Sequence, residues 1–259
     1  MLLGVSTVAM AEGEESIQTE LVEYMIQVNQ QLGLVLTESE IEQLEITVEQ
    51  AAKKYSEAEG ITMAEAYDKL LEEAMNGAPL LSASEPSAYA SRTVVLPTAS
   101  TGAIFFIDSE SAWNHVGLYT SSTYIVESMP EDGVQYWKYN DPEAYQNVVT
   151  NPADGVNDSC IMTVDTTTSK RKAAAAWPGE NIEAGTPYDY DFLDNKQDYY
   201  TSGANTTKSE LDALNCSELV WKAYKKAANI DLDGNGGLGV YPNDVLDSDN
   251  TTKVQGNWW

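Results

Sequence analysis

The chain has 259 residues and a formal net charge of −27, from 41 acidic against 14 basic side chains. Nucleic acids and anionic membrane surfaces repel so acidic a protein, which argues against both as partners. Apolar residues make up 42% of the chain, enough for a sizeable core, and no run in it approaches the roughly 18 apolar residues of a membrane span.

Residues 1–11 are typical of the end of a secretory signal peptide. An apolar stretch is followed by Ala-Met-Ala, a small-x-small cleavage pattern that ends just before Glu12. The positively charged start of an ordinary signal is missing. We interpret residues 1–11 as a signal-peptide remnant and expect an exported, bacterial extracellular or cell-wall-associated protein. A disordered apolar N-terminus is the alternative.

Residues 12–78 are predicted to form an acidic accessory segment of three helices. Apolar residues recur there at three- and four-residue steps. Thr37 with Glu40, and Thr62 with Glu65, form the capping-box pattern that begins a helix. No catalytic pattern is found in this segment, so binding of an unknown protein partner is the function expected for it.

The residue pattern changes from helical to strand-like after a predicted linker at residues 79–100, which is rich in Ser, Ala and Pro. Short β-branched and aromatic runs follow, and helical patterns return at residues 169–177 and after Cys216. This layout predicts an α+β domain over residues 101–259. The expected strands are TVVLP (93–97), AIFFI (103–107), HVGLYTSSTYIVES (115–128) and CIMTV (160–164).

Cys216 stands at the predicted start of a helix. Leu219, Val220, Ala223 and Tyr224 recur after it at three- and four-residue steps, which builds one apolar stripe. A thiol in this place faces unpaired backbone N–H groups and the positive end of the helix dipole, and both favour the thiolate. Cys216 is therefore a candidate nucleophile. The alternative is a small buried core residue, which is the usual state of a free cysteine.

His115 is the single histidine of the chain, and this narrows the possible chemistry. A zinc site of His and Cys needs more such ligands at short spacing, so no metal or other cofactor is expected. A serine hydrolase is disfavoured because the G-x-S-x-G elbow is missing. A Cys–His pair is the nucleophile and base that this composition supports.

A hairpin over residues 115–128 is predicted to bring a carboxylate to His115. If Tyr119 pairs with Thr123, His115 lies directly opposite Glu127, with Cβ atoms about 5 Å apart on one face. The carboxylate then accepts the imidazole N–H and stabilises the imidazolium. A one-residue slip would send the two side chains to opposite faces. The alternative is a strand-end histidine near an unrelated surface glutamate.

The order of these segments resembles a known family. NHVGLY and YIVES are followed by GTPYDYDF, and then by NCSELVWKAY and YPNDVLDSD. This arrangement is similar to the YiiX/YebB-like group of circularly permuted NlpC/P60 cysteine hydrolases, in which the histidine strand precedes the cysteine helix. The resemblance covers about residues 101–250 and leaves the N-terminal helices unexplained.

The resemblance implies a fold and a set of roles. The fold would be a permuted papain-like α+β domain with an antiparallel sheet or barrel and a nucleophile helix, preceded by the three-helix segment. Cys216 matches the family nucleophile, His115 the general base and Glu127 the orienting residue. Tyr188 and Tyr190 would line the substrate pocket, or else pack under the helix. The implied activity is hydrolysis of an amide bond, in cell-wall peptides or related γ-glutamyl or N-acyl amides.

Two other functions remain open. The Asn-Cys motif also resembles that of lecithin:retinol acyltransferase-like proteins, which move acyl groups between lipids, although the acidic charge disfavours lipid work. In a third interpretation the domain is a non-catalytic binding module.

Two further features concern cysteine and calcium. Cys160 lies in a predicted core strand and is interpreted as a structural residue. The alternative, in an oxidising compartment, is a disulfide between Cys160 and Cys216, which would block thiol chemistry. Residues 231–244 begin like a calcium loop, yet Pro242 stands at the twelfth position, where an EF-hand needs Glu. A metal-free turn is expected there, and a partial calcium turn is the alternative.

Overall fold

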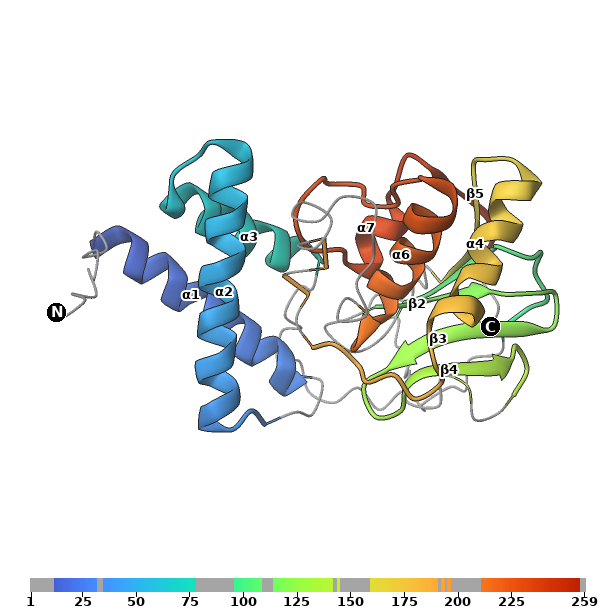
Figure 1. The fold of residues 1–259 in the computed structure, drawn as a ribbon, viewed down its shortest axis with the longest axis horizontal. Coiled ribbons are helices and arrows are strands. Elements are labelled where there is room, and N and C mark those ends of the chain that lie inside the picture. The colour runs from blue at the N-terminus through green and yellow to red at the C-terminus, as the bar shows by residue number, and fades with distance from the viewer. Residues whose placement is uncertain are drawn as a thin grey trace, which may run out of the picture.

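The computed structural model describes residues 12–31, 35–77, 96–108, 114–141, 144, 159–190, 192–193, 195–196 and 211–256. These residues form a unit of three N-terminal helices beside a sheet with its own helices (Figure 1). The predicted signal-peptide remnant at residues 1–11 and most of the predicted linker lie outside the described residues.

The N-terminal helices are α1 (Glu12–Gln31), α2 (Glu38–Glu59) and α3 (Met63–Gly77). The capping box predicted at the start of α2 is present, since the Thr37 backbone N–H donates to the Glu40 carboxylate at 2.7 Å. Thr62 and Glu65 interact in the same way, at 2.8 Å, at the start of α3. The helices α2 and α3 therefore begin where their capping signals place them, and the helix expected before them forms as α1.

A six-stranded open sheet is the centre of the second part, and every pairing between its described strands is antiparallel. The strand order is β4-β3-β2-β1-β5-β6. The strands are β1 (Ile104–Ile107), β2 (His115–Tyr119), β3 (Tyr124–Met129), β4 (Gly133–Lys138), β5 (Cys160–Val164) and β6 (Thr251–Gly256).

The predicted α+β architecture is confirmed, with two differences in the strands. The sequence analysis did not predict β4 or β6, which form the two edges of the sheet. β6, TTKVQG, carries few apolar residues, because one partner strand and solvent are its neighbours rather than a core. Of the predicted strand at residues 93–97, only the last two residues are described, and they lie outside any strand.

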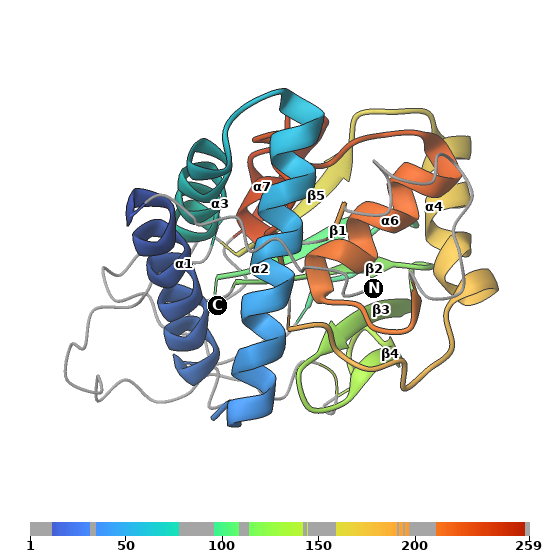
Figure 2. The ribbon, with the colours of Figure 1, turned by 60° about the vertical axis from the view of Figure 1, so that its left-hand side comes forward.

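Among the described residues, the helices that accompany the sheet are α4 (Thr168–Asn181), α6 (Cys216–Ala228) and the short α7 (Pro242–Leu246). The two longer ones lie side by side (Figure 2), and α6 packs against β2 and β3 through a shared apolar core. Among the described helices, none has the length and apolarity needed to cross a membrane. The sheet thus holds α6, whose first residue is Cys216, against the strand that begins with His115.

The core of the N-terminal helices extends into the second part of the molecule. Five apolar residues from outside α1–α3 belong to the same buried cluster: Tyr188, Phe192, Leu193, Leu238 and Tyr241. Gly77 at the end of α3 contacts the Tyr241 ring so closely that an added Cβ would overlap it. The accessory helices are therefore joined to the sheet domain by a common apolar core.

Candidate active site

Cys216 is the first residue of α6, as the sequence analysis predicted, and it is 2% exposed. Asn215 is the N-cap: its side-chain oxygen accepts the Glu218 backbone N–H at 2.9 Å, and the Glu218 carboxylate accepts the Asn215 N–H at 3.3 Å. This capping box fixes the start of the helix and so the place of the thiol. The Asn-x-x-Glu spacing was visible in the sequence, and the sequence analysis did not use it.

His115 and Glu127 are in contact, with His115 Nε2 2.9 Å from Glu127 Oε2. The predicted register between their strands is wrong. Tyr119 pairs with Ile125 rather than with Thr123, so the register is displaced by two residues and Glu127 lies diagonally from His115. The side-chain period of a strand is two, so a two-residue displacement keeps both side chains on one face. The contact survives because a diagonal neighbour is within reach of a long side chain.

Gly117, between His115 and Tyr119 on β2, has no side chain, and this leaves space for an aromatic ring beside the imidazole of His115. The Phe105 ring occupies the space that a Cβ at Gly117 would need. The centroid of this ring is 5.6 Å from that of His115 and 6.1 Å from that of Tyr119. Phe105 thus packs against one side of the imidazole and limits the orientations open to it.

Cys216 and His115 form a hydrogen-bonded pair, and both are buried. Burial by itself lowers the pKa of His115, but hydrogen bonds to Cys216 and Glu127 and the negative charge of both raise it to about 9. Burial has the opposite effect on the Cys216 thiol and raises its pKa. Interactions with His115 and with two backbone N–H groups more than offset this, so the net shift of the Cys216 pKa is downward. The arrangement favours a thiolate–imidazolium pair.

The two backbone donors to the Cys216 sulfur are the N–H groups of Val116 and Ser217. Val116 follows His115 on β2, and Ser217 follows Cys216 on α6. The sulfur is therefore held by the beginning of the strand and by the beginning of the helix. The Ser217 hydroxyl is fixed in turn by the Val240 carbonyl, at 2.6 Å.

The two predicted pocket tyrosines have different surroundings. Tyr188 is buried and its hydroxyl hydrogen-bonds to Cys216; burial, followed by the charge of Cys216, raises the Tyr188 pKa. Tyr190 is half-buried, and its hydroxyl donates to the Pro130 carbonyl at 2.6 Å. The rings lie 5.0 Å apart. The structure thus brings Tyr188 to the sulfur, whereas the hydroxyl of Tyr190 is used in a backbone contact.

Neither cysteine forms a disulfide in this structure. Cys160 begins β5 and is 3% exposed, inside the same apolar core as α6. The interpretation of Cys160 as a structural core residue agrees with this position. Because Cys160 is a second buried thiol, it provides an internal comparison for the reactivity of Cys216.

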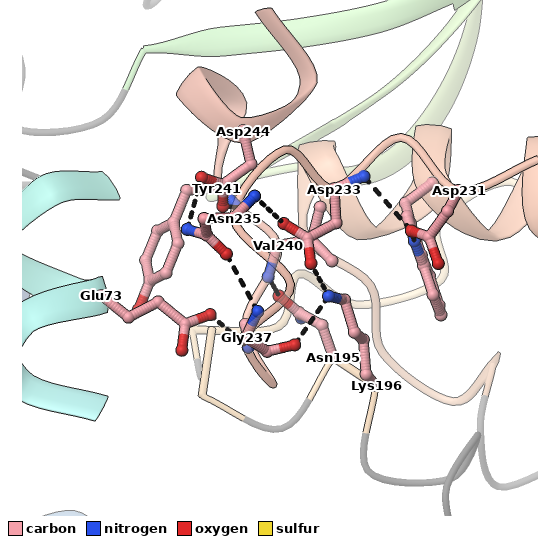
Figure 3. Close-up of polar contacts among 12 residues, drawn as sticks. Glu73, Asn195, Lys196, Asp231, Asp233, Asn235, Gly237, Val240, Tyr241 and Asp244 are labelled. Carbon is pink, nitrogen blue, oxygen red and sulfur yellow. Dashed lines mark hydrogen bonds and ion pairs between the residues drawn. The ribbon is translucent and has the colours of Figure 1, made fainter. Parts of the chain in front are cut away.

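In the loop that begins like a calcium site, lysine side chains supply the positive charge next to the carboxylates. Lys196 forms an ion pair with Asp233 and donates to the Gly237 carbonyl at 2.6 Å (Figure 3). Lys225 contacts Asp231 at 2.6 Å. Asp233 and Gly237 stand at the third and seventh positions of the calcium pattern, where an EF-hand uses a carboxylate and a carbonyl. Lys196 therefore uses two groups that a calcium ion would need.

Over the ranges that the structure describes, no group of three or more His, Cys, Asp or Glu side chains is arranged to hold a metal ion. Glu127 and Cys216 are the acidic partners of the single histidine. With one imidazole, one thiol and one carboxylate already bound to each other, the site does not fit a resident metal, and we derive no step through one.

Comparisons with known proteins give one similar sequence and one similar solved structure, whereas no family model matches the chain. YycO of Bacillus subtilis strain 168, described only as an uncharacterised protein, is 36% identical over 167 residues, which are 63% of this chain and 59% of YycO. Among solved structures, the metalloprotein YiiX from Escherichia coli O157:H7 matches with a TM-score of 0.42 and 17% identity, over 63% of this chain and all of that one.

The identity to YycO indicates common ancestry over the matched stretch, and this chain spans 59% of the length of YycO. The likeness to YiiX, at a TM-score of 0.42, carries no conclusion about activity.

Proposed function

We propose that the protein is a secreted cysteine hydrolase that cleaves an amide bond through Cys216, His115 and Glu127. The observation that carries this proposal is the buried hydrogen-bonded pair of Cys216 and His115, with Glu127 2.9 Å from the other side of the imidazole. Nucleophile, base and orienting carboxylate lie in one line of contacts, which is the arrangement of a catalytic triad.

In the proposed first step the Cys216 thiolate attacks the carbonyl carbon of the amide and forms a C–S bond. The developing oxyanion is stabilised by backbone N–H groups at the start of α6. His115, protonated in the resting pair, gives its proton to the leaving nitrogen, and the C–N bond breaks. The products of this step are a free amine and a thioester on Cys216.

In the second step neutral His115 takes a proton from water, and the oxygen attacks the thioester carbon. The C–S bond breaks, the carboxylic acid leaves, and the thiolate–imidazolium pair is restored. Glu127 accepts from the imidazole throughout and keeps its orientation. Because the pair is buried, the charges interact in a medium of low dielectric constant, which strengthens their attraction.

The proposed substrates are cell-wall stem peptides or related γ-glutamyl or N-acyl amides, and the proposed location is outside the bacterial cell. The family resemblance and the signal-like residues 1–11 support both. The net charge of −27 suits a substrate that presents a free amine. A lipid acyl group is the competing substrate class, and stimulation of turnover by lipid vesicles would favour it.

The test is the rate of Cys216 alkylation by iodoacetamide as a function of pH, in a Cys160→Ala background that leaves one thiol. We expect fast reaction at about pH 6, well below the free-cysteine pKa of about 8.5, and loss of this reactivity in His115→Ala. Detection by mass spectrometry of a thioester with an amide substrate would complete the assignment. A thiol that stays inert until about pH 8 would contradict the proposal and favour the binding module.

A further inference from the structure

Residues 237–240 form a short segment in the second half of the calcium-like loop, just before α7, and its backbone is held from several sides. Four buried polar side chains from three separate parts of the chain bind it: Glu73, Asn195, Lys196 and Ser217. We call this segment with its four side chains the loop clamp. Figure 3 shows Glu73 pointing toward the segment from α3 while Asn195 and Lys196 approach it from another side.

Glu73 makes the contact that comes from the accessory helices. Its carboxylate accepts the Gly239 backbone N–H at 2.9 Å, and it also accepts from Leu238. A Cβ at Gly237 would overlap the Glu73 carboxylate, so the segment passes against this side chain without a gap. α3 therefore fixes the backbone of residues 237–239 by direct hydrogen bonds as well as by packing.

The next residue, Val240, connects the segment to the nucleophile helix. Its carbonyl accepts the Ser217 hydroxyl at 2.6 Å, and its N–H donates to the Asn195 side chain at 2.9 Å. The Ser217 hydroxyl also contacts the Asn215 side-chain oxygen at 3.0 Å. The Ser217 N–H is one of the donors that lower the pKa of Cys216. The position of Val240 thus affects a donor to the sulfur.

We infer that Glu73 is a positioning residue for Cys216, and that the accessory helices are a working part of the active site. The contacts run from Glu73 to the Gly239 N–H, along one peptide to the Val240 carbonyl, and through Ser217 to the sulfur. This inference rests on the proposed function, because it concerns the reactivity of the same thiol. It gives the acidic N-terminal helices a role that the family resemblance does not explain.

The protonation of Glu73 suits this role. Burial raises its pKa to about 8, with Lys196 opposing the shift and Asp244 adding to it. At neutral pH the side chain is therefore largely the neutral acid, which still accepts the Gly239 N–H through its carbonyl oxygen. Glutamine has the same shape, is also neutral and keeps the accepting oxygen, so Glu73→Gln preserves the contact whereas Glu73→Ala removes it.

The experiment measures the midpoint pH of Cys216 alkylation in the full chain carrying Cys160→Ala. The midpoint is independent of how far the thiol is shielded, and the thiolate absorbance in the ultraviolet gives it without a reagent. We expect Glu73→Ala to raise the midpoint by about one pH unit, and Glu73→Gln to stay near the unmodified profile. Glu72→Ala is the matched control, because Glu72 is exposed on the same turn of α3.

Ser217→Ala tests the other end of the same contacts. It should shift the profile in the same direction, and the double variant Glu73→Ala/Ser217→Ala should show less than the sum of the two shifts, because both act along one chain of contacts. Additive shifts, or an unchanged midpoint in Glu73→Ala with its fold intact by circular dichroism, would overturn the positioning role alone. A midpoint near the free-cysteine value in the parent chain would overturn the proposed function, and the positioning role with it.

Discussion

The molecule contains two buried clusters of ionisable side chains in which burial has opposite outcomes. In the cluster of Cys216, His115 and Glu127, the partners outweigh burial, since the pKa of the thiol falls and that of the imidazole rises to about 9. In the loop clamp burial prevails: the pKa of Glu73 rises to about 8 and that of Lys196 falls to about 8. The first cluster favours charged groups, whereas in the second burial favours the neutral acid of Glu73 while Lys196 keeps its ion pair with Asp233.

The difference lies in the partners that each cluster supplies. The Cys216 sulfur has an imidazole and two backbone N–H groups directed at it, so its charged form is solvated by the protein. Glu73 accepts from two backbone N–H groups and has Lys196 near it, yet Asp244 adds negative charge beside it. The first cluster therefore holds charge, which the proposed chemistry needs, and the second holds backbone in place.

The largest expected effect is that of Cys216→Ala on hydrolysis. Removal of the nucleophile should lower kcat by several orders of magnitude, because the thioester route then lacks its reacting atom. Cys160→Ala should leave turnover near the parent value. Amide hydrolysis with a peptide substrate measures both, and equal losses in the two variants would show that Cys216 is not the nucleophile.

The next effect concerns the stability of the loop clamp. Lys196→Met leaves the Asp233 carboxylate buried without its ion pair, and breaking a buried pair on one side costs roughly 3–5 kcal/mol of unfolding free energy. Lys225→Met, at a more exposed pair, should cost less than about 1 kcal/mol. Urea denaturation measures both. Similar losses would mean that Lys196 is not the cation around which the turn is organised.

Glu127→Gln tests the electrostatic role of the carboxylate in the cluster of Cys216, His115 and Glu127. Removing the negative charge should lower the pKa of His115 from about 9, so the fall of activity at alkaline pH should begin at a lower pH. The rate at neutral pH should fall by about 10²-fold, since a base that is wrongly oriented transfers protons poorly. The dependence of kcat/KM on pH tests this. An unchanged alkaline limb would argue that Glu127 has no electrostatic role.

The smallest effect is the pH dependence of stability that Glu73 contributes. Its folded pKa of about 8 exceeds the ordinary value of 4.5, so the folded state keeps a proton that the unfolded state releases, and stability falls as pH rises between these values. Glu73→Gln should flatten this fall, by a few degrees of melting temperature. Thermal unfolding at several pH values measures it, with Glu72→Ala as the variant whose slope should match the parent.

Several features of the site could be predicted because their causes are local. The Thr37 and Thr62 capping boxes form between residues three apart, and the helix after Cys216 follows from its apolar stripe. The face shared by His115 and Glu127 follows from the period of two along a strand, which is why their contact survived an error of two residues in the register.

The sequence by itself therefore determined five of the described helices, α7 being the exception, four of the strands and the order of histidine strand and cysteine helix. The tertiary structure alone decided the strand register, the edge strands β4 and β6, and the loop clamp. Lys196 and Glu73 lie in segments with no chemical pattern of their own, far along the chain from the loop that they bind. A buried charge pairs with whichever polar group lies next to it in the folded structure, not with a neighbour in the sequence. Here these groups become neighbours only after the helices have packed against the sheet domain.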